Sequence, residues 1–275
     1  MAFSAPFRPS ESASNGGAAV APFLMTPLLA AGIAAIALGM AIGATGIGGV
    51  LLVPILTLAL GIDVKRAIAA ALLSYLPACV IAVTMYARRG SIVWRDAWPL
   101  CLAALPAAWL GARAARGAPG TLLEAAIGVL LLAGGLYAVR TPRNAASGGR
   151  RLGSGVLLGL GAGTAFVSAL TGAGGAFVLL PALLLLDMPV LPAIGLGQAI
   201  ALPIAGLASV ANMQAGLIDA PLAALLAAGL SAGIAVGTPI AHALPQLVLR
   251  RLLGALVVAA GAGMVLRTAM HMFAA

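Results

Sequence analysis

The stretch Thr45-Gly46-Ile47-Gly48-Gly49 opens an apolar run that ends at Pro54. The pattern returns 126 positions later as Thr171-Gly172-Ala173-Gly174-Gly175, which opens an apolar run that ends at Pro181. A fixed period of this kind indicates two halves built on one plan, each with an apolar segment that glycines interrupt. The same offset relates further glycines, namely Gly90 with Gly216, Gly111 with Gly237 and Gly128 with Gly254.

The composition points to a membrane environment. Hydrophobic residues make up 63% of the chain and charged residues 8%, and the mean hydropathy is +1.14. Nearly every stretch between charges is long enough to cross a hydrocarbon core of about 30 Å. A spanning backbone must satisfy its own hydrogen bonds, and the many Ala, Leu and Gly residues favour closely packed helices. The sequence therefore predicts an all-α membrane protein, a polytopic helical bundle.

The chain divides into four segments by composition. Residues 1–23 are rich in Ser, Ala, Gly and Pro and are predicted to be a disordered N-terminal tail. Residues 24–140 and 152–270 are predicted to be the first and second membrane repeats. Between them, the polar and glycine-rich residues 141–151 are predicted to be a cytoplasmic linker.

The glycine break decides how each half is built. Residues 24–61 are too long for one span, but the break leaves two pieces that are short for full crossings, so we expect a helical hairpin. The hairpin returns the chain to the side of the membrane on which it started, and three further spans then take it to the other side. Because each half thus ends on the side opposite to its start, the second half must have the inverted orientation in the membrane. The prediction is two inverted repeats, each a glycine-broken helical hairpin plus three spanning helices.

The positive charges offer a check on this arrangement. If the linker is cytoplasmic, alternation places Arg88, Arg89 and Arg95 in the cytoplasm and the loop 214–219, which has no Lys or Arg, outside. This asymmetry is what inverted halves require. Four basic residues would face outward against the rule, namely Lys65, Arg66, Arg113 and Arg116.

The two glycine clusters are the candidate binding site for an anion. A glycine break lets backbones approach closely and leaves the first N–H groups of the next helix unpaired, which with the helix dipole attracts negative charge. Polar side chains at depth in the third span of each half add hydrogen-bonding groups. Two alternatives stay open: the glycines only allow tight helix crossing, and Gln198 only forms an interhelical hydrogen bond. The candidate substrate-binding residues are Thr45, Gly46, Gly48, Gly49, Ser74, Thr171, Gly172, Gly174, Gly175 and Gln198.

The motifs of other function classes are missing from the sequence. It contains no P-loop, no H-E-x-x-H and no G-x-S-x-G, so we expect no enzyme activity, no cofactor and no bound metal. All six acidic residues fall in the predicted tail, loops or helix ends, and Glu124 is interpreted as an interfacial charge. The net charge of +9 is assigned to membrane topology rather than to nucleic-acid binding.

The repeated Thr-Gly-x-Gly-Gly motifs, with their apolar runs to Pro54 and Pro181, resemble the sulfite exporter TauE/SafE family of membrane transporters. The loops Gly90-Ser-Ile and Gly216-Leu-Ile-Asp and the glycines at 111 and 237 carry the same resemblance. It implies a multi-pass protein of the cytoplasmic (inner) membrane that moves small sulfur-containing anions such as sulfite or sulfonates.

These observations together favour a secondary transporter that binds its anion between the two glycine tips and works by alternating access. The expected partners are a small anionic substrate and the lipid bilayer, not nucleic acid, and a homo-oligomer is left open. Because no carboxylate is expected at depth, voltage alone could drive a monoanion out of the cell, at roughly 2.3 kcal/mol per 100 mV. An anion-selective channel and a non-transporting membrane subunit remain the alternatives.

Overall fold

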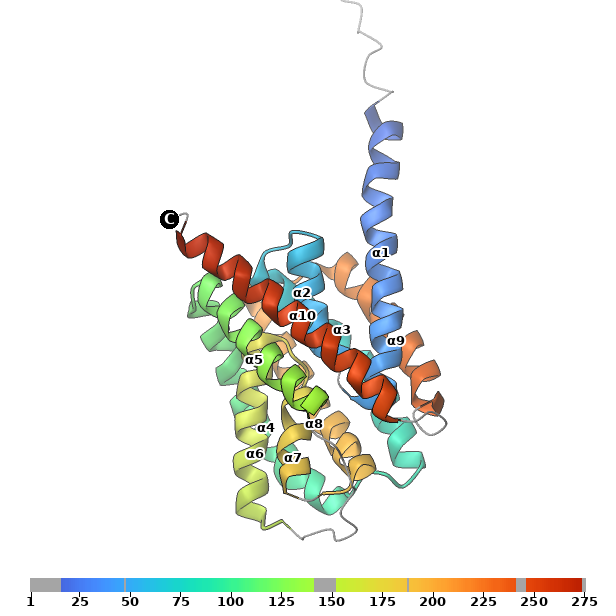
Figure 1. The fold of residues 1–275 in the computed structure, drawn as a ribbon, viewed down its shortest axis with the longest axis vertical. Coiled ribbons are helices and arrows are strands. Elements are labelled where there is room, and N and C mark those ends of the chain that lie inside the picture. The colour runs from blue at the N-terminus through green and yellow to red at the C-terminus, as the bar shows by residue number, and fades with distance from the viewer. Residues whose placement is uncertain (1–15, 47, 141–151, 187, 241–245, 274–275) are drawn as a thin grey trace, which may run out of the picture.

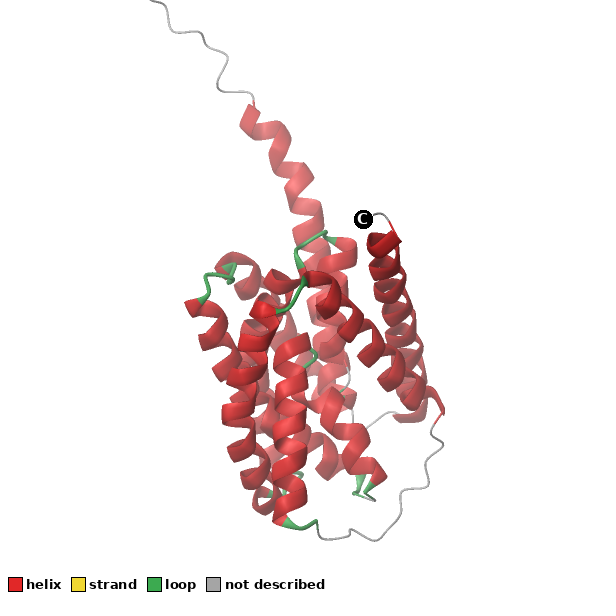
Figure 2. Ribbon diagram, turned by 90° about the vertical axis from the view of Figure 1, so that its left-hand side faces the viewer, coloured by secondary structure: helices red, strands yellow, loops and turns green. Residues whose placement is uncertain are grey.

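The computed structural model describes residues 16–46, 48–140, 152–186, 188–240 and 246–273. Over these ranges the chain is helical, without any strand, and the helices form one bundle (Figure 1). Most helices run roughly along one direction, with the connecting loops at the two ends of the bundle (Figure 2). The predicted all-α bundle is therefore confirmed.

The first half contains four long helices and one short, broken helix. The long helices are α1 (Gly16–Thr45), α3 (Val64–Arg88), α4 (Trp94–Gly117) and α5 (Gly120–Arg140). The short one consists of a 3-10 turn η1 (Gly48–Leu51), a single turn α2 (Leu52–Pro54) and a π-helix η2 (Ile55–Ala59). Asp63 fixes the start of α3, because its Oδ1 accepts hydrogen bonds from the backbone N–H groups of Lys65 and Arg66.

The second half repeats this order of elements. Its helices are α6 (Ser154–Thr171), α7 (Gly175–Leu185), α8 (Val190–Gln214), α9 (Ala220–Ile240) and α10 (Gln246–Phe273). Both ends of α8 lie 126 positions after those of α3, and α6 ends 126 positions after α1. The offset found in the sequence is therefore also the offset between corresponding helices.

The first helix starts before the predicted first membrane repeat. α1 begins at Gly16, within the segment 1–23. Residues 16–23 lead directly into the apolar run that forms the rest of α1. Residues 1–15 and the predicted linker 141–151 lie outside the described part of the chain.

The two halves interlock through glycines. α4 packs against α6 of the second half, and α9 packs in the same way against α1 of the first. A Cβ at Gly111 in α4 would collide with the carbonyl oxygen of Phe166, and one at Gly237 in α9 would collide with that of Met40. The matched glycines 111 and 237 thus allow matched close approaches of two backbones.

Helices α5 and α10 form a further close pair, side by side in Figure 1. Gly128 of α5 lies against Val265 of α10, and Gly135, seven residues later, lies against Val258. Residue numbers therefore rise along α5 as they fall along α10, so the two helices run antiparallel. α5 and α10 are counterparts in the repeat, since they begin at Gly120 and Gln246.

Five helical segments of the described chain are long and apolar enough to cross a membrane. The apolar segments that follow the glycine motifs are shorter: Gly49–Ala59 in the first half and Gly175–Leu185 in the second. A full crossing takes about 17 residues or more, so η1–η2 and α7 are too short to span. The five spanning candidates are Val64–Arg88, Gly120–Tyr137, Ser154–Thr171, Leu191–Gln214 and Ala220–Pro239.

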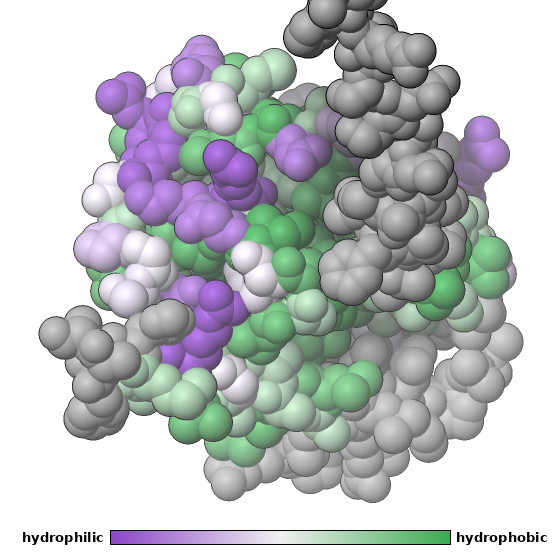
Figure 3. Space-filling model, turned by 90° about the horizontal axis from the view of Figure 1, so that it is seen from above, coloured by the Kyte–Doolittle hydropathy of each residue, from purple (hydrophilic) through white to green (hydrophobic). Residues whose placement is uncertain are grey.

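One end of the bundle carries a group of polar residues. Viewed from above, hydrophilic residues gather on the left of the face, and hydrophobic residues lie beside and below them (Figure 3). The start of α3 and the end of α4 meet at this end, where Lys65 Nζ donates a hydrogen bond of 2.9 Å to the carbonyl oxygen of Arg116. Arg66 and Arg113 are exposed on the same two segments.

Candidate functional site

The two glycine motifs meet at a single cavity of about 30 Å³. Gly46 and Gly49 of the first motif line it, as do Gly174 and Gly175 of the second. Ala173 and Ala176 complete the lining on the side of the second motif. Segments 126 positions apart in the sequence are therefore neighbours in space, and they are the segments singled out as the candidate site.

Left-handed glycines shape both sides of the cavity. Gly46 ends α1 with a φ of 75°, and Gly172 ends α6 with a φ of 70°. Each donates its N–H to a carbonyl oxygen four residues earlier, at 2.8 Å in both cases. Side chains with a Cβ rarely adopt this backbone conformation, so the motif needs glycine at these positions.

The N-terminus of α7 opens onto the cavity. Gly174, with a φ of 73°, is its N-cap, and no side chain caps the helix there. Gly175 and Ala176, the first two residues of α7, both line the cavity. The first N–H groups of a helix lack partners within the helix, and together with the helix dipole they attract an anion. This arrangement favours a negatively charged ligand.

Tyr75 of α3 crosses the cavity between the two motifs. Its hydroxyl donates a hydrogen bond to the carbonyl oxygen of Gly49, and a Cβ placed on Gly174 would lie 3.9 Å from its ring. Tyr75 was not among the predicted site residues. The signal for it was an asymmetry of the repeat, because the counterpart of Tyr75 in α8 is Ala201, which also lines the cavity.

Gln198 of α8 is the predicted polar side chain that does line the cavity. It is 1% exposed, and its Nε2 donates a hydrogen bond of 3.4 Å to the carbonyl oxygen of Ile42 in α1. The same Nε2 lies 4.0 Å from where a Cβ on Gly46 would be. The sequence left open whether Gln198 forms an interhelical hydrogen bond or lines the binding site. In the structure Gln198 does both.

Three predicted hydroxyls donate hydrogen bonds within their own helices. Thr45 Oγ1 donates to the carbonyl oxygen of Ala41 at 2.9 Å, and Thr171 Oγ1 donates to that of Val167 at 2.7 Å. Ser74 Oγ donates within α3 at 2.8 Å. None of the three lines the cavity, nor does Gly172. Of the remaining candidates, Gly48 is the first residue of η1.

The remaining lining is apolar, with one thiol. Ile42, Cys79 and Ala201 complete it, and no lining residue carries a charge. Space of this size holds about two water molecules. Within the described residues, no group of three or more His, Cys, Asp or Glu side chains is placed to hold a metal ion. Backbone N–H groups and the donors of Tyr75 and Gln198 are therefore the polar groups on offer to a ligand.

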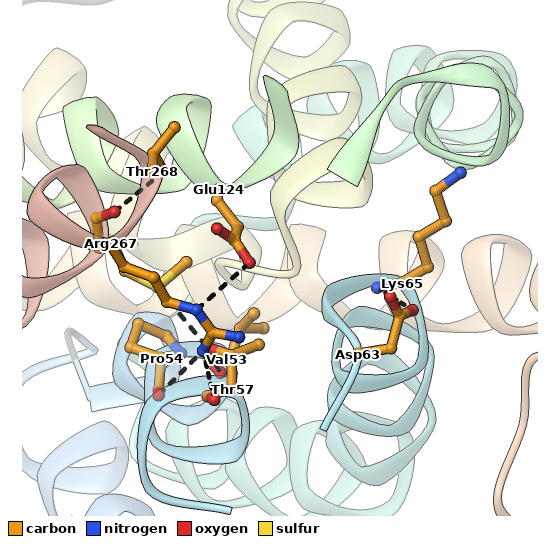
Figure 4. A network of polar contacts seen from close by, with 9 residues as sticks. Val53, Pro54, Thr57, Asp63, Lys65, Glu124, Arg267 and Thr268 are labelled. Carbon is orange, nitrogen blue, oxygen red and sulfur yellow. Dashed lines mark hydrogen bonds and ion pairs between the residues drawn. The ribbon is translucent and has the colours of Figure 1, made fainter. Parts of the chain in front are cut away.

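A charged cluster lies at the far end of the first short helix (Figure 4). Arg267 Nη1 of α10 donates a hydrogen bond of 2.6 Å to the carbonyl oxygen of Thr57 in η2, and its Nε lies 3.8 Å from Glu124 Oε1 of α5. Glu124, interpreted from the sequence as an interfacial charge, is only 8% exposed. It pairs with Arg267, which lies far from it in the sequence, so no local pattern could indicate the contact.

Comparison with known proteins identifies the family. No curated protein and no solved structure matches the chain significantly. A family model described as sulfite exporter TauE/SafE does match, over residues 28–264. The match includes both glycine motifs, Tyr75, Gln198 and Glu124, and it covers most of the 275 residues. The chain therefore belongs to the sulfite exporter TauE/SafE family, whose members are multi-pass membrane transporters.

Proposed function

We propose that this protein is a secondary transporter of small sulfur-containing oxyanions or organosulfonates, with the substrate bound between the two glycine motifs. The observation that carries the proposal is the common cavity, which both motifs line and onto which α7 opens. Family membership supports the transport of sulfur-containing anions. The substrate site and the mechanism are our proposal.

The chemistry of the cavity suits an oxyanion. The N–H groups at the start of α7 can donate hydrogen bonds to its oxygens, and the lining offers no carboxylate that would repel it. Tyr75 and Gln198 donate to backbone carbonyls in the empty site. Both donors can turn to the anion when it enters. The Ile42 carbonyl then keeps its hydrogen bond from the Gly46 N–H, whereas the Gly49 carbonyl gives up the bond from Tyr75, a cost that the hydrogen bonds to the anion must offset.

The packing of the helices suggests which parts move. α1 and α9 are joined by close glycine contacts, and so are α4 and α6. Each such pair contains one helix from each half of the sequence. We therefore expect two rigid groups of helices to rock against each other in alternating access. One group is α1, α3 and α9, and the other is α4, α6 and α8. One glycine motif belongs to each body. The antiparallel α5 and α10 support the inverted relation of the halves that this mechanism uses.

The cavity in this structure is smaller than the proposed substrate. It has room for about two water molecules, which is too little for a sulfur oxyanion. Tyr75 is the bulky side chain in the lining, so movement of its ring away from Gly49 would make the room.

The two cysteines give a matched test. Cys79 lines the cavity from α3, whereas Cys101 on α4 does not. Replacing Cys79 by Phe places a ring in the cavity without altering a glycine turn. We expect Cys79→Phe to abolish the uptake of labelled sulfite, thiosulfate or a small sulfonate into proteoliposomes, while Cys101→Phe retains it.

The same experiment separates the alternatives. A carrier shows saturable uptake and counterflow, whereas a channel shows neither. A purified wild-type chain that gives no substrate-dependent flux would favour a non-transporting subunit. Normal transport by a folded Cys79→Phe variant would show that the substrate does not pass through this cavity.

A further inference from the structure

Two polar side-chain groups of α8 are buried and have no hydrogen-bond partner among the described residues. They are the hydroxyl of Ser209 and the amide nitrogen Nδ2 of Asn212, and the two residues are 4% and 3% exposed. Both lie in Leu191–Gln214, which is long and apolar enough to cross a membrane. An unpaired polar group is costly in such a place, and native structures keep few of them. Both groups can donate hydrogen bonds, so an anion is a suitable ligand.

One face of α8 connects these two groups to the substrate cavity. Gln198 and Ala201 line the cavity, and Ala205, Ser209 and Asn212 follow Ala201 at intervals of four, four and three residues. Residues at such intervals lie on the same face of a helix. Ala205, between the cavity and the two donors, is buried and has a small side chain. This face therefore runs from the cavity to the last turn of α8.

The last turn of α8 lies at the end of the bundle where α3 begins. A Cβ at Gly195, near the start of α8, would collide with the carbonyl oxygen of Ser91, just after the end of α3. Further along α8, Gly206 lies against Leu76, in the middle of α3. Residue numbers therefore rise along α8 as they fall along α3, and the two helices run antiparallel.

Positive charge is in excess at this end of the bundle. The start of α3 and the end of α4 carry four basic residues, namely Lys65, Arg66, Arg113 and Arg116. The carboxylates of Asp63 and Asp219 also lie here, where they cap α3 and α9. A surface with an excess of positive charge raises the local concentration of anions.

We infer that the face of α8 with Ser209 and Asn212 is the path along which the anion passes between this end of the bundle and the cavity. The two donors form an entry site on that path, and the inference rests on the proposed transport function. Two neutral donors attract an oxyanion without holding it tightly. Passage requires such a balance, because a bound ion must also leave.

The repeat provides this polar face in the second half only. The counterparts of Ser209 and Asn212 on α3 are Val83 and Tyr86. Tyr86 is fully buried, and its hydroxyl donates a hydrogen bond of 3.0 Å to the carbonyl oxygen of Gly43. Because α3 runs opposite to α8, these counterparts point the way to the other end of the bundle. A large side chain with a partner thus stands where α8 has a small unpaired amide.

Thiol labelling in lipid nanodiscs tests the path without any flux. Ser209→Cys is made in a Cys79→Ser, Cys101→Ser background, which removes both natural thiols. Two methanethiosulfonate reagents are compared, one with a sulfonate group and one with a trimethylammonium group, each relative to its rate with a small thiol in solution. The sulfonate reagent should react about fivefold faster or more, and an unreactive alkyl sulfonate should slow it. Arg66→Gln and Arg113→Gln, or added salt, should reduce this preference about twofold or more.

Ala211→Cys in the same background is the matched control. Ala211 is fully buried between the two donors along the chain but lies on another face of α8, so this variant should react with neither reagent. Equal relative rates of the two reagents at Ser209→Cys would indicate a water-filled gap without preference for anions and would overturn the inference. Failure of Ser209→Cys to react, or equal labelling of Ala211→Cys, would overturn it as well.

Uptake into proteoliposomes tests the entry site itself. Thr and Val have the same shape, so Ser209→Thr and Ser209→Val differ in the hydroxyl, and the Thr variant should take up labelled sulfonate faster. Asn212→Leu should lower uptake at low sulfonate concentration about tenfold, the factor expected for one hydrogen bond to a charged group. Its Tm should equal or exceed that of the wild type, because the change removes an unpaired buried donor. A lower Tm together with lower uptake would mark a structural role of Asn212 and contradict the entry site.

Failure of the inference and failure of the proposed function are distinguishable. A wild-type chain without flux that still shows the expected labelling would refute the transport function and leave the anion path standing. Saturable uptake that is the same in the wild type and in Asn212→Leu would refute the entry site and leave the transport function standing.

Discussion

At the scale of single residues, Tyr75 decides how large a substrate the cavity admits. Its ring lies between the two motifs, where the second half has only Ala201. We expect Tyr75→Ala to shift the ratio of kcat/KM toward larger alkyl sulfonates and away from sulfite. Tyr75→Phe keeps the ring and should keep the size limit, but it leaves the Gly49 carbonyl without its hydrogen bond, which costs about 1–3 kcal/mol of stability.

Tyr86 is the control for this prediction. It lies on the same helix, is fully buried and donates a hydrogen bond of 3.0 Å to the carbonyl oxygen of Gly43, but it does not line the cavity. Tyr86→Phe should therefore cost a similar stability, measured by thermal unfolding in detergent, without changing substrate preference. Unchanged preference in Tyr75→Ala would mean that another residue sets the limit.

The sequence predicted those residues of the site that occur at matched positions in both halves. It did not predict the residues at positions where the two halves differ. Matched positions pointed to Gly46, Gly49, Gly174 and Gly175, because a glycine break is a backbone requirement that both halves share. Tyr75 corresponds to Ala201 and Glu124 to Arg250, so these positions carry no matched pair of residues that would have marked them as part of the site. In register, Glu124 corresponds to Arg250 rather than to Arg267, its partner in space.

At the scale of helices, the glycines that join α4 to α6 and α9 to α1 should carry much of the stability. Gly237→Ala places a Cβ against the backbone of Met40, which cannot yield as a side chain could. We expect a loss of about 1–3 kcal/mol or more, seen as a lower Tm in detergent. Gly159 of α6 has open space around it, so Gly159→Ala should be neutral or stabilise by up to about 1 kcal/mol. Equal effects of the two changes would contradict the close packing.

The positions of the helices along the chain could be predicted from the sequence, but the pairs of helices that pack against each other could not. Apolar length and the glycine breaks were enough to place α3, α8 and the short α7, because these are local properties. The pairing of α4 with α6 across the halves depends on which glycine surfaces fit together. That fit is a property of two distant segments, and the offset of 126 positions does not reveal it.

At the scale of the whole molecule, alternating access makes Cys79 reachable from both sides of the membrane in turn. In a Cys101→Ser background, a membrane-impermeant maleimide should label Cys79 in vesicles of either orientation, and an unreactive alkyl sulfonate should slow both reactions. Cys79→Ser is the control that assigns the label. Because the cavity has room for only about two water molecules, labelling should be slow and should report the opening of each side. Labelling from one side alone would contradict rocking of the two bodies around a shared site, and labelling that the sulfonate does not slow would place the substrate elsewhere.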